Sequence, residues 1–263
     1  MNSQKDVDAN LLAAEQLIKQ ASQRGGQLLV LPEMFACLGV TNQYHLASRR
    51  FTAQDVLATL AAWSKKYQVY LVAGSLPLRS AQHEQKVFAS CLVFSPQGKQ
   101  LAAYQKIHLF DVAVADEKGA YKESNTFLAG CEPQQVRVAG VNLGLTICYD
   151  LRFPELFQHY MRQGCEIISV PSAFTYKTGE AHWEILLRAR AIETQSFILA
   201  ANQVGVHEDG RRTWGHSMIV APSGEILAQV TGSEPGIAMA RLDFGALKAC
   251  REAMPLAQHK RLT

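Results

Sequence analysis

The apolar residues of this chain recur in two patterns, one with a spacing of three or four residues and one in short unbroken runs. The first pattern predicts amphipathic helices, and the second predicts strands that are buried on both faces. We expect helices over residues 6–23, 51–66, 152–163 and 180–195. We expect strands over residues 27–33, 69–73, 88–94, 101–107, 141–147, 166–170, 197–203, 216–221, 226–230 and 236–242.

The order of these elements indicates an α/β protein. Helices and strands alternate at first, and a hairpin over residues 88–107 follows, so the sheets are expected to be mixed rather than purely parallel. The chain has no internal repeat, no low-complexity segment and no linker-like stretch. We therefore predict a single domain over residues 1–263, with two sheets in the middle and helices outside.

Composition and charge narrow the class of protein. The chain has 263 residues, of which 48% are hydrophobic and 19% are charged, as in a soluble globular enzyme. A formal net charge of +3 without a dense basic run gives no reason to expect nucleic acid as a partner, and no apolar stretch is long enough to predict a membrane span. The six cysteines form no CxxC pair, and the eight histidines show no HxxxH or HxH spacing. We expect reduced thiols in a cytoplasmic protein, no metal and no cofactor.

Cys148 lies where a predicted buried strand passes into a predicted helix. A cysteine at such a turn places its sulfur at the end of the sheet, as in the nucleophile elbow of hydrolases, with Cys in the place of Ser. The helix N-terminus would favour the thiolate, which is the reactive form. Free cysteines are also among the most deeply buried residues, so an inert core thiol is an equally open interpretation of this segment.

Three charged residues interrupt or border apolar segments elsewhere. Glu33 is the first ionisable residue at the end of the apolar run 27–33, and Lys106 lies within an apolar, aromatic run. Glu123 lies in the stretch 111–130, which has no clear periodicity. Taken singly, each has an ordinary explanation: a surface or capping glutamate, an edge-strand lysine that opposes aggregation, and a solvated glutamate.

Together with Cys148, these residues suggest a thiol hydrolase. A carboxylate beside the thiol can take its proton and later return it to a leaving amine. A lysine beside both can keep the acid ionised and stabilise the oxyanion of a tetrahedral intermediate, together with the backbone N–H of Tyr149. Such a site needs no metal and no cofactor.

Three segments resemble the signature motifs of the nitrilase superfamily, the carbon–nitrogen hydrolases. They are Leu-Pro-Glu33, Lys106-Ile-His-Leu and Cys148-Tyr-Asp-Leu-Arg-Phe-Pro-Glu155, in the family's order. The resemblance implies a four-layer α-β-β-α sandwich of two mixed sheets flanked by helices. It also implies Glu33 as the base, Lys106 as the oxyanion stabiliser, Cys148 as the nucleophile and Glu123 as a second active-site glutamate that positions the lysine and the substrate.

Further segments are similar to the small amidases of the superfamily. They include Pro171-Ser-Ala-Phe174, the residues 178–184 and 187–193, and Trp214-Gly-His-Ser-Met218. The similarity is greatest to the group that hydrolyses deaminated glutathione to 2-oxoglutarate and cysteinylglycine, and ω-amidases acting on 2-oxoglutaramate or 2-oxosuccinamate come next. A catalytically idle member of the family that serves as a binding protein is the alternative from another class.

A substrate of this kind is a small anionic α-keto amide, so its pocket needs a cation. Arg152, shortly after Cys148, is a candidate for binding a carboxylate, and a structural ion pair with Asp150 or Glu155 is the alternative. Tyr149, Phe174 and Thr175 are candidate pocket walls, although core packing would also explain the two aromatic residues. We interpret the other conspicuous ring residues, His182 and His216, as structural.

The resemblance has one departure and one further implication. Family members usually begin with a strand, of which this chain has almost nothing before residues 2–4, so we expect that N-terminal strand to be missing from the sheet. The family is usually dimeric. We therefore expect a homodimer, with residues 152–163 and 180–193 contributing to the interface.

Overall fold

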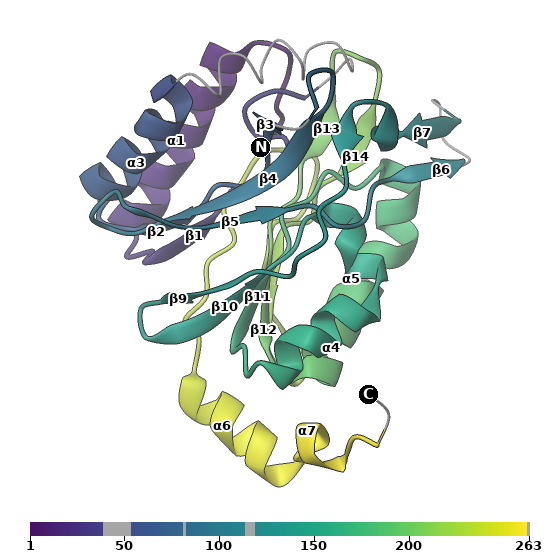
Figure 1. Cartoon of the computed structure of the whole chain (residues 1–263). Coiled ribbons are helices and arrows are strands. Elements are labelled where there is room, and N and C mark those ends of the chain that lie inside the picture. Colours follow the sequence, from purple (N-terminus) through teal and green to yellow (C-terminus); the bar gives the residue numbers. More distant parts are fainter. Residues whose placement is uncertain (39–53, 81–82, 114–118, 262–263) are drawn as a thin grey trace.

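The computed structural model describes residues 1–38, 54–80, 83–113 and 119–261. Two mixed sheets occupy the middle of the molecule, α1 and α3 cover one of them, and α4 and α5 cover the other (Figure 1). The predicted α-β-β-α architecture is confirmed. No helix in this described part of the chain has the length and apolar character needed to cross a membrane.

The first sheet contains the strands that lead to Glu33 and Lys106. Strands β1 and β2 are parallel, and β4 pairs antiparallel with β2, β3 and β5. The short strand β8 pairs parallel with β4. The bounds are β1 Leu28–Val30, β2 Tyr70–Val72, β3 Leu76–Arg79, β4 Val87–Phe94, β5 Gln100–Gln105 and β8 Phe127–Leu128.

Helices α1 (Val7–Gln23) and α3 (Gln54–Tyr67) match the predicted segments, apart from residues 51–53, which lie outside the described residues. Asp6 caps α1 because its side chain accepts hydrogen bonds from the N–H groups of Asp8 and Ala9. The apolar face of α1, including Ala14 and Ile18, is buried in a cluster with residues of α3 and the first sheet. The two helices therefore pack against the outer face of the first sheet.

The second sheet contains the strand that leads to Cys148, in the order β16-β15-β12-β11-β10-β9. Its middle strands β10, β11 and β12 are parallel, and the flanking pairs are antiparallel. The bounds are β9 Gln135–Val138, β10 Val141–Leu145, β11 Ile167–Ser169, β12 Phe197–Ala200, β15 Met218–Val220 and β16 Ile226–Gln229, with α4 Pro154–Arg162 and α5 Tyr176–Thr194 outside.

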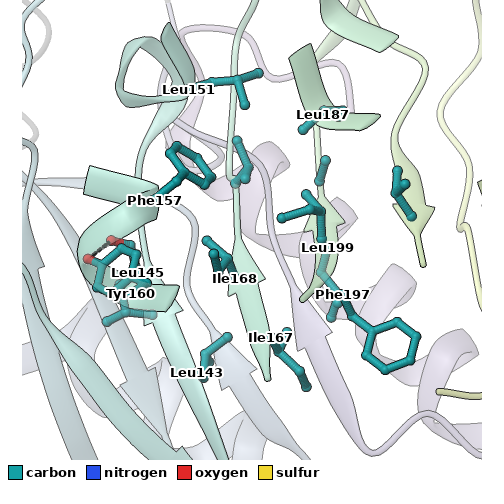
Figure 2. Packing of buried hydrophobic residues seen from close by; sticks show 14 of the residues in the cluster. Leu143, Leu145, Leu151, Phe157, Tyr160, Ile167, Ile168, Leu187, Phe197 and Leu199 are labelled. Carbon is teal, nitrogen blue, oxygen red and sulfur yellow. Dashed lines mark hydrogen bonds between the residues drawn. The ribbon is translucent and has the colours of Figure 1, made fainter. Parts of the chain in front are cut away.

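The main core joins both sheets with helices α4 and α5. It includes Val93 of the first sheet. Figure 2 shows Leu145 of the second sheet and Leu187 of α5 in the same cluster. Gly144 lets the ring of Tyr160 lie directly against β10, since a Cβ there would be 2.7 Å from the ring. The Tyr160 hydroxyl donates to the carbonyl of Leu145 (Figure 2). This packing holds the end of β10, and so the position of Cys148.

Several elements differ from the predictions. Helix α5 begins four residues earlier than expected, and the stretch 111–130 contains the hairpin of β6 (Asp111–Ala113) and β7 (Ala120–Lys122). A second unpredicted hairpin joins β13 (Val204–Val206) and β14 (Arg212–Trp214). The chain ends with α6 (Phe244–Ala253) and α7 (Leu256–His259).

The strand predicted over residues 236–242 is wrong. These residues form no ladder with any strand of the described chain. Instead they line a cleft of about 760 Å³ that is also bordered by β1 and by parts of β12 and β15. An apolar run forms a strand only where a neighbouring backbone supplies hydrogen bonds. Residues 236–242 border the cleft instead of a paired strand.

Candidate active site

The buried amine of Lys106 bridges two carboxylates. Its Nζ lies 2.8 Å from Oε1 of Glu33 and 3.0 and 2.9 Å from the two oxygens of Glu123. Lys106 is 1% exposed and Glu33 is 2% exposed. The surface and edge-strand interpretations of these residues are therefore wrong, because a solvated side chain would not be enclosed in this way.

The backbone explains how residues so distant in the sequence meet. Glu33 follows β1 after Pro32, and Lys106 follows β5, in the same sheet. Glu123 opens a short 3-10 turn (Glu123–Asn125) directly after β7, and it also accepts a hydrogen bond of 2.7 Å from the N–H of Phe110. The β6–β7 hairpin thus returns the chain so that Glu123 closes over Lys106.

Cys148 begins a 3-10 turn, Cys148–Arg152, at the end of β10. The α-helix that follows starts only at Pro154, so the helix predicted from residue 152 begins later than expected. The backbone φ of Cys148 is +48°, a left-handed value that is strained for a residue with a Cβ. Its N–H donates to the carbonyl of Pro171 at 2.8 Å, which fixes the turn.

The thiol of Cys148 is neutral in this arrangement. Burial raises its pKa well above the ordinary value, and the negative charge of Glu33 raises the pKa further, while Lys106 and a hydrogen bond from the backbone of Ala173 lower it. The expectation of a thiolate stabilised by a helix N-terminus is therefore wrong. A buried, protonated thiol needs a base beside it, and Glu33 hydrogen-bonds with it.

The charges around Lys106 favour its ammonium form. Burial acts to lower the pKa of Lys106, but the negative charges of Glu123 and Glu33 outweigh it and raise that pKa well above the ordinary value. Burial and the charge of Glu33 raise the pKa of Glu123, against the opposing effect of Lys106. The centre is thus a cation held between two carboxyl groups, beside a thiol.

Asp150 ties the nucleophile turn to the lysine segment. Its side chain is completely buried and accepts hydrogen bonds from the hydroxyl of Tyr104 at 2.6 Å and from the N–H of Ile147 at 2.8 Å. It also contacts the backbone N–H and Nδ1 of His108 at 3.0 and 2.7 Å. Because Tyr104 and His108 flank Lys106 in sequence, one carboxylate connects both halves of the site.

A pocket of about 290 Å³ opens above these groups. All four candidate substrate-binding residues border it, namely Tyr149, Arg152, Phe174 and Thr175. Among the described residues, Arg152 makes no ion pair with Asp150 or Glu155; it lies 3.3 Å from Nδ1 of His182 and 5.4 Å from the ring centre of Phe174. The structural ion pair considered for Arg152 is therefore wrong.

Sequence reasoning missed other residues of the pocket wall. Phe110, Tyr121 and Arg211 also line it. Tyr121 comes from the aperiodic stretch 111–130, and Phe110 directly precedes that stretch. Arg211 comes from the loop between β13 and β14, whose concentration of charge was the only available signal. His182 and His216 are outside the pocket lining, and His216 stacks on Trp214 with ring centres 4.2 Å apart.

The remaining cysteines differ from Cys148 in their surroundings. Cys37, Cys91 and Cys165 are buried, Cys250 is half-buried, and Cys131 is exposed. Burial raises the pKa of Cys37 to about 11, and the negative charge of Glu208 contributes to the increase. Cys148 alone among the described cysteines lines the pocket.

Comparison with known proteins identifies this arrangement. Residues 1–252 match the family described as carbon-nitrogen hydrolase. The chain is 41% identical over 263 residues to a deaminated glutathione amidase of Synechocystis sp., which covers 99% of this chain and 95% of the relative. It is 36% identical over 252 residues to the omega-amidase NIT2 of Xenopus tropicalis, covering 96% and 89%.

Solved structures agree with the fold. The NitFhit protein of C. elegans superposes with a TM-score of 0.92 at 34% identity, covering 99% of this chain and 63% of that one. An amidase from Nesterenkonia sp. superposes with a TM-score of 0.78 at 26% identity, covering 97% and 96%. That structure shows the product of Michael addition of acrylamide at the active-site cysteine of the Nesterenkonia enzyme.

Proposed function

The chain belongs to the carbon–nitrogen hydrolase family and is an amidase, and on this basis we propose that it hydrolyses deaminated glutathione to 2-oxoglutarate and cysteinylglycine. The observation that carries the proposal is the Lys106 ammonium held between Glu33 and Glu123 beside the Cys148 thiol. The identity to the Synechocystis deaminated glutathione amidase, 41% against 36% to the Xenopus ω-amidase, supports the choice of substrate.

In the first half of the proposed reaction, Glu33 takes the proton of the Cys148 thiol and the sulfur attacks the scissile carbonyl carbon. The raised pKa of the thiol makes this base necessary, because a neutral thiol is a weak nucleophile. The new oxyanion is stabilised by the Lys106 ammonium and by the backbone N–H of Tyr149. That N–H precedes the first hydrogen bond within the 3-10 turn, so the turn does not use it.

In the second half, Glu33 returns the proton to the nitrogen of cysteinylglycine, which leaves. The 2-oxoglutaryl group then remains on Cys148 as a thioester. A water molecule attacks the thioester carbonyl while Glu33 accepts its proton, and 2-oxoglutarate is released as the thiol is reformed. Glu123 holds Lys106 in place throughout by its two contacts of 2.9 and 3.0 Å.

Arg152 binds the carboxylate of the α-keto acid in this proposal. It borders the same pocket as Cys148, and its guanidinium lies 5.9 Å from the ring centre of Tyr149 and 5.4 Å from that of Phe174. A planar guanidinium between two rings is pre-oriented for a bidentate contact with a carboxylate.

The decisive experiment compares wild type with Cys148→Ala. Turnover of deaminated glutathione should vanish in the variant while its circular dichroism and urea midpoint remain those of a folded protein. Cys91→Ala, which removes a buried thiol away from the pocket, is the matched control and should retain turnover. Mass spectrometry of rapidly quenched wild-type enzyme should detect the 2-oxoglutaryl thioester.

A parallel assay with 2-oxoglutaramate separates the two amidase activities. The proposal requires a higher kcat/KM for deaminated glutathione. A higher value for 2-oxoglutaramate would instead identify an ω-amidase, and turnover of neither compound by a folded protein would refute both assignments.

A further inference from the structure

Three aromatic rings form a row along the wall of the active-site pocket. The ring centre of Phe110 lies 5.3 Å from that of Tyr121 and 5.0 Å from that of Tyr149. The three rings come from the β6–β7 region and from the turn that begins at Cys148, and all of them line the pocket. The row is thus an extended apolar surface that starts beside the nucleophile.

A guanidinium stands at each end of this row. The guanidinium of Arg152 lies 5.9 Å from the ring centre of Tyr149. The guanidinium of Arg211 lies 5.2 Å from the ring centre of Tyr121. Both arginines line the pocket, and the side chain of Arg211 is only 14% exposed. Each of the two cations is thus associated with a different ring of the row.

Cationic side chains are prominent in the pocket wall. Among the described residues that line it, Lys106, Lys122, Arg152 and Arg211 are cationic, and Glu33 and Glu123 have carboxyl groups. Lys106 is held between the two glutamates, and Asp209 accompanies Arg211. Two arginines on the wall of one pocket suit a substrate with two carboxylates.

We propose that Arg211 binds a carboxylate on the leaving group, so that the enzyme selects amides that are anionic on both sides of the scissile bond. The inference rests on the proposed function and goes beyond it in one respect. Arg152 binds the carboxylate of the acyl group, which is present in every α-keto amide substrate considered. Arg211 binds the leaving group. In deaminated glutathione the leaving group has a carboxylate, whereas the leaving group of 2-oxoglutaramate is ammonia, which has none.

The dimensions and chemistry of the site agree with this assignment. An extended dipeptide spans roughly 7 Å, so cysteinylglycine can lie along the row of rings, whose centres are 5.0 and 5.3 Å apart. Asp209 lies 3.9 Å from a terminal nitrogen of Arg211, longer than a direct hydrogen bond. Arginine has five N–H donors, so Asp209 can orient the guanidinium while a substrate carboxylate binds to it.

The first test replaces Arg211 by Gln and measures kcat/KM for both substrates. For deaminated glutathione we expect a loss of about 10- to 100-fold, chiefly in KM, as for removal of a hydrogen bond to a charged group. For 2-oxoglutaramate the loss should be much smaller, about threefold at most. Arg211→Lys keeps the charge without the planar fork and should recover part of the activity.

A purely structural role for Arg211 would give another result, because a disturbed loop would lower kcat/KM for both substrates by the same factor. The neighbouring Arg212→Gln is the matched control, since Arg212 lies over the ring of Tyr176 and is outside the pocket lining. An equal loss on both substrates, or no loss on either, would overturn the inference.

The second test changes the substrate instead. An analogue of deaminated glutathione with a C-terminal amide lacks the carboxylate assigned to Arg211. Wild type should hydrolyse this analogue about 10- to 100-fold less efficiently than deaminated glutathione, whereas Arg211→Gln should treat the two alike. Equal wild-type activity on both would refute the role of Arg211 and leave the proposed function intact, while wild-type inactivity toward deaminated glutathione would refute the proposed function itself.

Discussion

Nδ1 of His108 lies 2.7 Å from Oδ1 of Asp150, so the segment that carries Lys106 is held directly to the turn that carries Cys148. A carboxylate only accepts hydrogen bonds, and Nδ1 is therefore the protonated nitrogen of this imidazole. The orientation of the His108 ring is also fixed, because the ring stacks on that of Phe153 with ring centres 3.7 Å apart. The relative position of amine and thiol depends on this buried contact.

Asp150→Asn should reduce both activity and stability. The amide places a donor where one carboxylate oxygen accepted, so at least one buried partner, such as the Tyr104 hydroxyl, loses its acceptor. We expect kcat to fall by about 10- to 100-fold and the free energy of unfolding to fall by about 2 kcal/mol. Urea denaturation and steady-state kinetics measure the two effects. Asp243→Asn is the control, because Asn caps a helix as well as Asp does; a comparable loss there would contradict the argument.

Glu123→Gln should shift the alkaline limb of the pH–rate profile. The charge of Glu123 raises the pKa of Lys106, so its removal lowers that pKa. Oxyanion stabilisation needs the ammonium form, and activity should therefore be lost at a lower pH than in wild type. The profile of kcat/KM on the alkaline side measures the shift. Glu132→Gln removes an exposed charge and should leave the profile in place, and an unshifted profile in Glu123→Gln would contradict the role assigned to it.

Glu33→Gln should behave differently because it removes the proposed base. General-base catalysis contributes about 10²- to 10⁴-fold, and a loss of this size in kcat/KM is expected at every pH at which wild type is active. The rate of alkylation of Cys148 by a small electrophile should fall as well, because the neutral thiol no longer has an acceptor for its proton. Undiminished alkylation would count against Glu33 as the base.

His207 should make the stability of the protein depend on pH. Its buried imidazole donates from Nδ1 to the carbonyl of Ser3 and accepts from the hydroxyl of Thr213, both at 2.8 Å. Burial lowers the pKa of His207 below its ordinary 6.5. Below pH 6.5 the unfolded chain therefore binds a proton that the folded chain resists, so this stabilisation is present above pH 6.5 and is lost as the pH falls through the folded-state pKa.

Urea denaturation at a pH above 6.5 and at a pH below the folded-state pKa of His207 measures this effect. Wild type should lose free energy of unfolding as the pH falls, and His207→Gln should lose less. The exposed His83 is the control position, where the same substitution should leave the wild-type slope. An identical slope in His207→Gln and wild type would show that other groups are responsible.

The predicted homodimer can be tested on helix α5. Ile185 is 69% exposed on the segment expected to face a second copy. If it is covered there, Ile185→Lys buries a charge and should convert a species of twice 29.0 kDa into the monomer, as measured by sedimentation. Leu12→Lys changes a residue that is 59% exposed on α1, on the opposite side of the molecule, and should leave the mass unchanged. A monomeric wild type would refute the dimer.

The sequence was sufficient for the layers and for finding the buried charges that lie together in the candidate site. Helix α1 and strands such as β10 have strong periods or unbroken apolar runs, and Glu33 and Lys106 stand out because a charge in such surroundings must be paired. The meeting of these residues with Cys148 followed from the family resemblance, since hydrophobic periodicity alone does not determine which strand ends are neighbours.

The missed features depend on tertiary contacts. Tyr121 belongs to a stretch without periodicity, which Phe110 directly precedes, and Arg211 reaches the pocket through the turn between two short strands. The protonation state of Cys148 was wrongly predicted because burial and the charge of Glu33 outweigh the field of a turn. Residues 236–242 have the composition of a strand, but ladder formation depends on a neighbour that an apolar pattern cannot reveal.

The exposure of Cys131 has a consequence for every measurement of molecular mass. Its thiol is accessible on the loop between β8 and β9, whereas the other described cysteines are buried or half-buried. In an oxidising buffer, two molecules can be joined by a disulfide between their Cys131 residues, and this covalent pair would have the mass of the predicted dimer. The apparent oligomeric state thus varies with redox potential, and only a dimer that persists in the presence of a reductant, or in Cys131→Ser, reflects association through the folded surface.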